Sequence, residues 1–212
     1  MLVLDHLAVV APSLEAGVAH VRESLGLAMG PGGRHPEMGT HNRLLRLGDD
    51  LFLEVIAVDP EAAPPPHRRW FGLDESEAVR ADWAAGRRLR SFVARTDGLD
   101  ALLARHAPEL GEAQRVSRGD RVWRFGVRPD GAMPRDGLLP SLIDWGPAGC
   151  PAPAMPEAGA RLRRLLVTHP EPGEAAALYA RLGLSGPFGF EAGPGFALSA
   201  EIETPAGLRR LT

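Results

Sequence analysis

The chain has 212 residues, which is long enough to bury a substantial apolar core in one large domain or two small ones. Its 44% hydrophobic and 24% charged residues are typical of a globular protein, and a net charge of −3 gives no electrostatic reason to expect nucleic acid or a membrane as a partner. All 24 basic residues are arginine and Cys150 is the only cysteine, which excludes lysine Schiff-base chemistry, internal disulfides and thiolate metal clusters and fits a reduced cytoplasm.

The first predicted elements are a Val/Leu-rich strand over residues 2–11 and a helix that follows it. Ser13 has the chemistry of an N-cap, and Gly26 that of a C-cap, so the helix is expected between them. Polar residues inside the strand, with no basic segment before it, argue against a signal peptide. No apolar stretch reaches the ~18 residues that predict a membrane span.

A Gly-rich polar segment, "GGRHPEMGTHN" at residues 32–42, follows the helix, and a further strand is expected around residues 28–34. The stretches "HNRLLRL" and "LFLEVIAV", separated by "GDD", predict a hairpin. The order β-α-β-β-β therefore describes a first unit over residues 1–58. Residues 59–87 are expected to form a Pro-rich linker and a short helix.

The same order recurs further along the chain. A second unit, residues 88–146, is predicted from "RLRSFVART", a helix opened by Asp97, and the strands "RVWRFGVRPDG" and "LLPSLIDWG". After a Pro/Ala/Gly-rich linker at 147–160, residues 161–212 form a third, partial unit that ends in a hairpin. Because only two units can close on each other, the third either docks on the outside of that pair or completes a homodimer.

The repeated order, with "LDHLAVVAPSLEAG" at the start of the first unit and "LEVIA" at its end, resembles the vicinal oxygen chelate superfamily, which includes glyoxalase, extradiol dioxygenases and bleomycin-resistance binding proteins. The stretch "GGRHPEMGTHNRLLRLGDDLFLEVIAVDP" is similar to the glyoxalase-like domain subgroup. The resemblance implies an α+β fold in which repeated β-α-β-β-β units curl into a mixed sheet around a cavity. It says little about the reaction, because this fold hosts many chemistries.

The resemblance also implies candidate metal ligands. His6 on the first strand and Glu54 on the last strand of the first unit match the family's ligand positions, and the pair would suit one divalent Zn, Mn, Ni or Fe ion. Asp144 is the candidate for a further ligand from the second unit. The position equivalent to His6 is Arg90 in the second unit or Arg164 in the third, and arginine cannot bind a metal. A site without metal is therefore the alternative.

The residue pattern itself favours a functional role for Glu54. A carboxylate in the middle of an apolar strand is costly to bury unless it is paired or metal-bound, although an outward-facing edge residue would escape that cost. Burial against an apolar wall is expected to raise its pKa toward neutrality, which suits a general base. Strand alternation predicts that Leu4 and His6 share one face with Ala8 and Val10.

The segment at residues 32–42 is interpreted as a wall of the same cavity, because it leads into the strand beside Glu54. His41 and Asn42 would line the cavity, with His35 above it as a lid. Arg90 or Arg164 would bind an anionic group of the ligand. The aromatic residues of the second unit are interpreted either as core or as an aromatic wall of the binding site, and comprise Trp123, Phe125 and Trp145.

Two functions agree with these features. The first is a lyase- or isomerase-type enzyme that binds a small oxygen-rich, anionic molecule, with Glu54 as general base or metal ligand and His6 as its partner. The second is a non-catalytic protein that binds or sequesters a small molecule, as the bleomycin-resistance proteins do. Both require a small-molecule partner, and they differ in whether Glu54 moves a proton.

Overall fold

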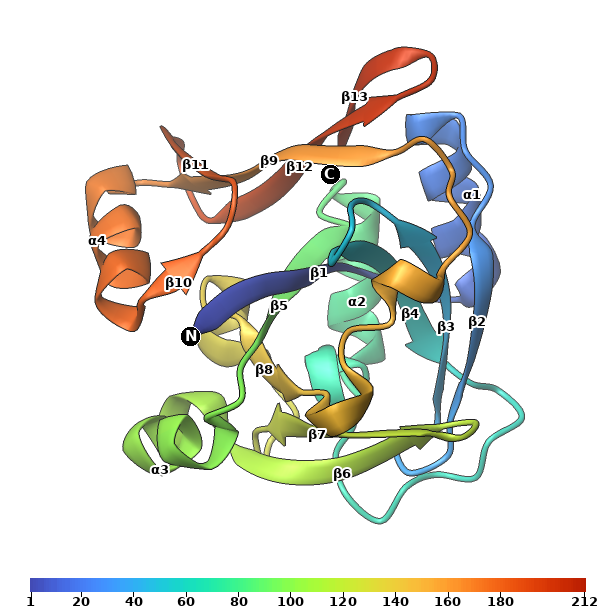
Figure 1. The fold of residues 1–212 in the computed structure, drawn as a ribbon, viewed down its shortest axis with the longest axis vertical. Coiled ribbons are helices and arrows are strands. Elements are labelled where there is room, and N and C mark those ends of the chain that lie inside the picture. The colour runs from blue at the N-terminus through green and yellow to red at the C-terminus, as the bar shows by residue number, and fades with distance from the viewer.

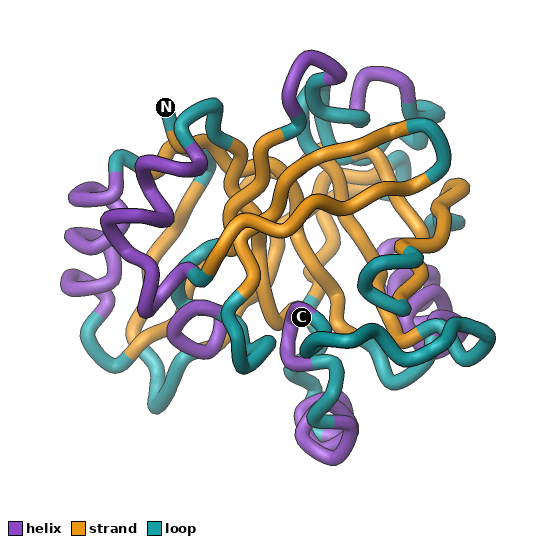
Figure 2. Tube along the Cα trace, turned by 90° about the horizontal axis from the view of Figure 1, so that it is seen from below, coloured by secondary structure: helices purple, strands orange, loops and turns teal.

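A computed structural model describes all residues, 1–212, as thirteen strands and four α-helices in two sheets (Figure 1). The strands occupy the middle of the molecule and the helices its periphery (Figure 2). The first half contains β1 (Leu2–Val10), α1 (Leu14–Leu25), β2 (Gly30–His35), β3 (Thr40–Arg46), β4 (Phe52–Val58) and α2 (Ser76–Ala84). The rest contains β5 (Leu89–Arg95), α3 (Leu99–Leu110), β6 (Glu112–Arg118), β7 (Arg121–Val127), β8 (Ser141–Asp144), β9 (Arg161–His169), α4 (Pro172–Leu182), β10 (Leu184–Ser185), β11 (Phe188–Ala192), β12 (Ala197–Thr204) and β13 (Gly207–Leu211).

The larger sheet has the strand order β2-β3-β4-β1-β5-β8-β7-β6, and β10 adds a short pairing to β1. β1 runs parallel to β4 and antiparallel to β5, so the first two units join through their first strands. The sheet curls strongly, which brings the β2–β3 hairpin toward the β6–β7 hairpin (Figure 1). The predicted mixed α+β fold with a curled sheet is therefore confirmed.

The third unit forms a separate sheet in the order β11-β9-β12-β13 and lies across β1 and β5 (Figure 1). Its apolar residues Leu165 and Leu198 belong to the same core cluster as Leu7 and Phe92 of the larger sheet. The Tyr179 hydroxyl adds a hydrogen bond of 2.8 Å to the backbone carbonyl of residue 138. Within the single chain, this unit is docked on the outside of the first pair.

The sequence signals predicted the helices of the first and second units, but they placed the cap of the second one incorrectly. Ser13 Oγ accepts a hydrogen bond of 3.2 Å from the Ala16 amide, and Gly26 ends α1 with a left-handed φ of 70°. The second unit's helix begins after Gly98 rather than at Asp97. β6 was not predicted from the sequence, because its mostly polar residues, of which one is buried, lack the apolar alternation of a buried strand.

A β-bulge in β1 changes which residues face the interior. Against β5, Leu4 pairs with Ala94 and His6 with Val93, so Asp5 is one extra residue in β1. Leu4 consequently belongs to the outer core cluster, whereas Ala8 and Val10 belong to the cluster inside the curled sheet. The expectation that Leu4 shares a face with His6 is therefore wrong, and the bulge buries two successive polar residues.

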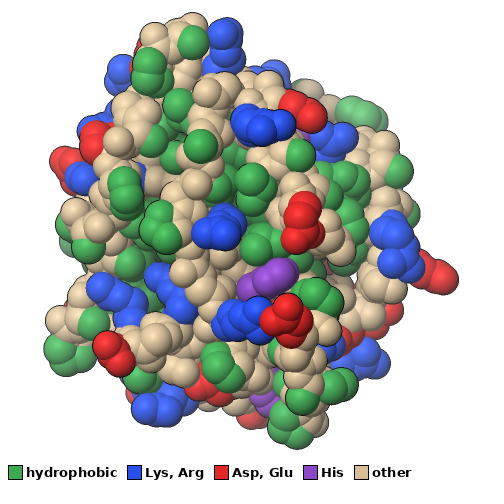
Figure 3. Space-filling model, turned by 90° about the vertical axis from the view of Figure 1, so that its right-hand side faces the viewer, with side chains coloured by type: hydrophobic (Ala, Val, Ile, Leu, Met, Phe, Trp, Pro, Cys, Tyr) green, Lys and Arg blue, Asp and Glu red, His purple; other side chains and the backbone are tan.

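The exterior shows no dominant charge on the face seen in Figure 3, where arginine and acidic side chains are interspersed. None of the helices is long and apolar enough to cross a membrane.

Candidate functional site

The inner face of the curled sheet encloses a small cavity. Its volume is about 20 Å³, which is room for about one water molecule. Polar residues from β1 to β4 lie on one side of the cavity, and aromatic residues from the second unit and the 70–72 turn on the other. The lining residues are His6, His35, Asn42, Phe52, Glu54, Trp70, Phe71, Arg118, Trp123, Phe125, Ile143 and Trp145.

His6 is held between two carboxylates. Its Nδ1 lies 2.7 Å from Asp5 Oδ1, and its Nε2 lies 3.5 Å from Glu54 Oε2. The other Asp5 oxygen accepts a hydrogen bond of 3.0 Å from Trp145 Nε1, and the Phe52 ring stacks on the imidazole at 4.4 Å. These contacts fix the imidazole with Nε2 facing Glu54, and the bulge at Asp5 makes them possible.

Glu54 is brought to His6 because β4 pairs with β1 on one side and with β3 on the other. Asn42 Nδ2, from β3, donates a hydrogen bond of 2.6 Å to Glu54 Oε1. The side-chain oxygen of Asn42, Oδ1, accepts a hydrogen bond of 2.9 Å from the backbone amide of Gly33, which fixes the orientation of the Asn42 side chain. His35 extends this network, with Nε2 at 3.3 Å from Asn42 Nδ2 and Nδ1 at 3.0 Å from Thr40 Oγ1.

The buried charges make His6 and Glu54 an ion pair. Burial alone would lower the pKa of His6, but the hydrogen bonds and charges of Asp5 and Glu54 outweigh it and raise the pKa to about 9. Burial likewise favours a higher pKa for Glu54, but His6, His35 and Asn42 together lower it to about 2. The expectation of a raised Glu54 pKa is therefore wrong. Burial lowers the pKa of His35 to about 4, so that imidazole is neutral at pH 7.

Three further hydrogen-bond donors of this site have few partners or none. Arg118 has no carboxylate partner, and its one side-chain hydrogen bond joins Nη1 to Asn42 Oδ1 at 3.5 Å. Trp70 and Trp123 both line the cavity and are only 4% and 5% exposed, yet neither indole Nε1 has a hydrogen-bond partner. Buried donors without partners are rare and costly, and at a cavity wall they mark positions where a ligand or water oxygen would be favourable.

The residues present do not fit a metal ion. No three His, Cys, Asp or Glu side chains come together in a way that could hold one. His6 and Glu54 face each other, but Asp5 lies on the opposite nitrogen of His6. Asp144 does not line the cavity. Its carboxylate instead accepts a hydrogen bond of 2.6 Å from Arg124. The expectation that Asp144 joins His6 and Glu54 as a third ligand does not agree with this geometry.

Several other predicted site residues lie away from the cavity. His41 neighbours Asn42 on β3 and therefore faces the opposite side of the strand. His35 lies inside the site, 2% exposed, rather than above it as a lid. Arg164 is exposed on β9, where its nearest carboxylate is that of Glu201 at 3.9 Å.

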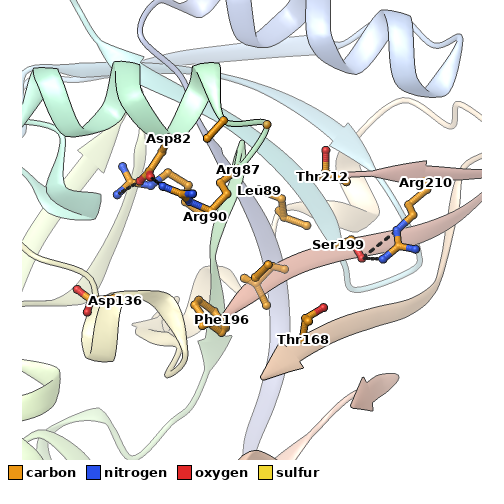
Figure 4. A pocket seen from close by; sticks show the side chains of 14 residues that line it. Asp82, Arg87, Leu89, Arg90, Asp136, Thr168, Phe196, Ser199, Arg210 and Thr212 are labelled. Atoms are coloured by element: carbon orange, nitrogen blue, oxygen red, sulfur yellow. Dashed lines mark hydrogen bonds and ion pairs between the residues drawn. The ribbon is translucent and has the colours of Figure 1, made fainter. Parts of the chain in front are cut away.

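Arg90 lines a different and larger pocket of about 460 Å³ between α2, β5 and the third unit's sheet (Figure 4). Its guanidinium pairs with Asp82 at 2.8 Å. Neither His6 nor Glu54 lines this pocket. The β1–β5 register explains why Arg90 is not beside His6. His6 is opposite Val93, and Arg90 lies toward the other end of the strand pair. The arginine that does reach the cavity is Arg118.

Asp5 and Arg118 belong to the site but were not predicted from the sequence. Asp5 carried a usable signal, because a second polar residue beside His6 in an apolar strand breaks alternation and can indicate a bulge. The sequence contains no such signal for Arg118, since an arginine before the "GD" turn is typical of the end of a hairpin strand.

Comparison with known proteins places the fold in a family. Residues 4–183 match the family described as "Glyoxalase-like domain", and the chain belongs to that family. A hypothetical protein from Staphylococcus aureus has the same fold, with a TM-score of 0.61 at 11% sequence identity, covering 100% of this chain and 99% of that one. A comparison with curated proteins found no match.

Methylmalonyl-CoA epimerases are also similar in structure. The enzyme from Mycobacterium tuberculosis gives a TM-score of 0.42 at 18% identity, covering 68% of this chain and 89% of that one. A variant from Streptomyces coelicolor, in complex with 2-nitronate-propionyl-CoA, gives 0.43 at 16% identity, covering 68% and 94%. The resemblance to the glyoxalase-like domain subgroup is confirmed by the family match.

Proposed function

We propose that this glyoxalase-like protein is an enzyme of isomerase or lyase type that transfers a proton next to a carbonyl group of a small, anionic, oxygen-rich molecule. The observation that carries the proposal is the buried pair of His6 and Glu54, with Nε2 and Oε2 3.5 Å apart at the wall of a cavity. One member is a cation that can donate a proton and the other an anion that can accept one, which is the arrangement that general acid–base catalysis uses.

In the proposed reaction the Glu54 carboxylate accepts the proton of the carbon beside the carbonyl, and the electron pair of the broken C–H bond moves into a C=C bond. The His6 imidazolium donates its Nε2 proton to the carbonyl oxygen, which gives a neutral enol, a neutral imidazole and a protonated Glu54. Return of the proton to a different face or carbon completes an isomerisation, and loss of a neighbouring leaving group would complete an elimination. Both groups start charged and both end neutral, so charge is balanced at each step.

Substrate binding would also adjust the strength of the base. The hydrogen bond from His6 is the largest influence that lowers the pKa of Glu54, whereas burial raises it. A carbonyl oxygen that accepts the Nε2 hydrogen bond of His6 removes this contact from Glu54 and leaves burial to raise its pKa. Asp5 remains on Nδ1 and keeps the imidazole oriented, which is the role of a positioning residue.

A second function, non-catalytic binding of a small molecule, is favoured by one observation. The cavity wall is strongly aromatic, with two unpartnered indole donors, and its present volume of about 20 Å³ is smaller than any organic substrate. A binding protein needs only this surface and an opening motion. Such a protein would have no use for an imidazolium and a carboxylate facing each other, which is why the enzyme is the first proposal.

The test is exchange of substrate hydrogen with solvent deuterium, followed by NMR over a panel of 2-oxo and 3-oxo carboxylates and phosphate esters of hydroxyketones. The wild-type protein is expected to exchange at least one member, and Glu54→Gln to slow that exchange by about 10²–10⁴-fold. Glu203→Gln, a strand glutamate in the third unit, is the matched control and should retain the rate. Ligands that bind to the wild-type protein without exchange would favour the second function instead.

A further inference from the structure

A second hollow lies next to the cavity and has an unusual charge composition. It measures about 320 Å³, which is ample for a small metabolite. Three of its lining residues are arginines and none is acidic, and the remainder are apolar or glycine. They are Ala28, Gly30, Pro31, Gly32, Leu44, Leu45, Arg46, Arg118, Arg121, Pro151, Ala154, Met155, Pro156 and Ala158.

Two of the three arginines have no carboxylate partner. Arg121 Nη1 donates only to the carbonyls of Ala148 and Gly149, at 3.2 and 2.6 Å, and Arg118 reaches only the side chain of Asn42. Arg46, in contrast, is 3.1 Å from Asp49. Guanidinium groups beside apolar walls with no counterion are favourable positions for a carboxylate or phosphate, which they can bind through paired hydrogen bonds.

Arg118 connects the outer hollow with the inner cavity, because it lines both. Its aliphatic stem crosses β2 at Gly33, where an added Cβ would lie 2.6 Å from Arg118 Cγ. Only glycine leaves space for that path. A second side-chain contact links the β6–β7 hairpin to the β2–β3 hairpin, because Ser117 Oγ donates a hydrogen bond of 2.6 Å to Glu37 Oε1. Arg118 is therefore held by packing and by one long hydrogen bond, so a ligand that binds its guanidinium breaks no ion pair.

We propose that the outer hollow is the anion-binding subsite of the enzyme, in which Arg118 and Arg121 bind a carboxylate or phosphate group of the ligand and Arg118 opens the cavity when it does so. This inference rests on the proposed function for the identity of the ligand as a substrate. It also supplies what the inner cavity lacks, which is room for the part of the molecule that does not react. The substrate class is a carbonyl compound with a compact apolar body and one anionic group.

The test is binding of two anionic probes, phenyl phosphate and benzoate, measured by isothermal titration calorimetry with phenol as the neutral control. We expect saturable binding of at least one anion, much weaker binding of phenol, and a loss of about tenfold or more in Arg118→Gln and in Arg121→Gln. Arg43→Gln removes an exposed arginine of β3 that lines neither hollow, and it should bind as the wild-type protein does. Comparison of the two anions distinguishes a phosphate site from a carboxylate site.

Gly33→Ala provides an independent variant, because it displaces the Arg118 stem without removing any charge. It is expected to weaken anion binding while circular dichroism shows a folded protein, and Arg121→Gln keeps the test decisive if Gly33→Ala does not fold. Failure to bind either anion at millimolar concentration, equal binding of phenol, or an equal loss in Arg43→Gln would overturn the proposal. Glu54→Gln separates the two hypotheses, since it should slow deuterium exchange by about 10²–10⁴-fold but should not weaken anion binding, because Glu54 lines only the inner cavity.

Discussion

Replacing Glu54 by glutamine should destabilise the protein in a way that depends on pH. The pKa of Glu54 is lowered from 4.5 to about 2, which corresponds to about 3 kcal/mol of stability at about 1.4 kcal/mol per pH unit. Because the folded-state pKa is the lower one, this contribution is fully present above pH 4.5 and is lost as the pH falls toward 2. Removal of one partner of a buried ion pair typically costs about 3–5 kcal/mol, which agrees with that figure.

The assay is urea unfolding of wild-type and Glu54→Gln protein between pH 6 and pH 3. The difference in free energy of unfolding should be about 3 kcal/mol at pH 6 and should fall to about 1 kcal/mol at pH 3, where the wild-type carboxylate loses most of its advantage. Glu203→Gln is the control, because that glutamate is also within a strand but its side chain is 42% exposed, and its effect should stay within about 0.5 kcal/mol. A Glu54→Gln effect that is equal at both pH values, or no larger than that of the control, would refute the buried ion pair.

Three other predictions follow from single contacts. Gly26→Ala should destabilise the protein by about 1 kcal/mol in urea unfolding, because φ is 70° there with no atom near the added Cβ, whereas Gly173→Ala, with a negative φ and the same open space, should not destabilise it. Tyr179→Phe should cost about 1 kcal/mol by the same measurement, because the docked third unit loses a hydrogen bond and leaves a carbonyl unpaired; an unchanged stability would argue against this docking contact. Added Zn²⁺ or Mn²⁺ should leave the melting temperature unchanged, since His6 and Glu54 offer only two ligands, and a stabilisation that disappears in His6→Ala would contradict this.

The sequence was sufficient for the parts of the site that depend on strand order and alternation. His6 was predicted to line the cavity from its position in the family that the sequence resembles. Glu54 was predicted from the same resemblance and because a carboxylate within an apolar strand is costly to bury unless it is paired. Asn42 was predicted because its segment leads into the strand beside Glu54. Asp5 beside His6 could have indicated a bulge, but the sequence does not show that the bulge turns Asp5 toward Trp145, because that depends on the pairing of β1 with β5.

The rest depends on how the curled sheet brings distant segments together. Arg118 reaches the cavity only because β6 approaches β2, which the local pattern of either strand does not encode. The placement of Arg90 failed because repeat alignment counts residues from a helix cap, whereas the cavity is positioned by the register of β1 and β5. The lowered pKa of Glu54 was missed for a related reason, since it depends on an imidazolium held by Asp5.

The charge state of His6 can be measured without knowing the substrate, and we expect an imidazolium paired with Glu54 at neutral pH. The measurement is a pH titration of the His6 ring by ¹⁵N NMR, in wild-type and Glu54→Gln protein. We expect both ring nitrogens of His6 to stay protonated at pH 7, the pKa of the ring to lie at about 9, and Glu54→Gln to lower this pKa because one of the two carboxylates is lost. A His6 ring that is neutral at pH 7, or a pKa that Glu54→Gln leaves unchanged, would contradict the claim and with it the proposed acid–base pair.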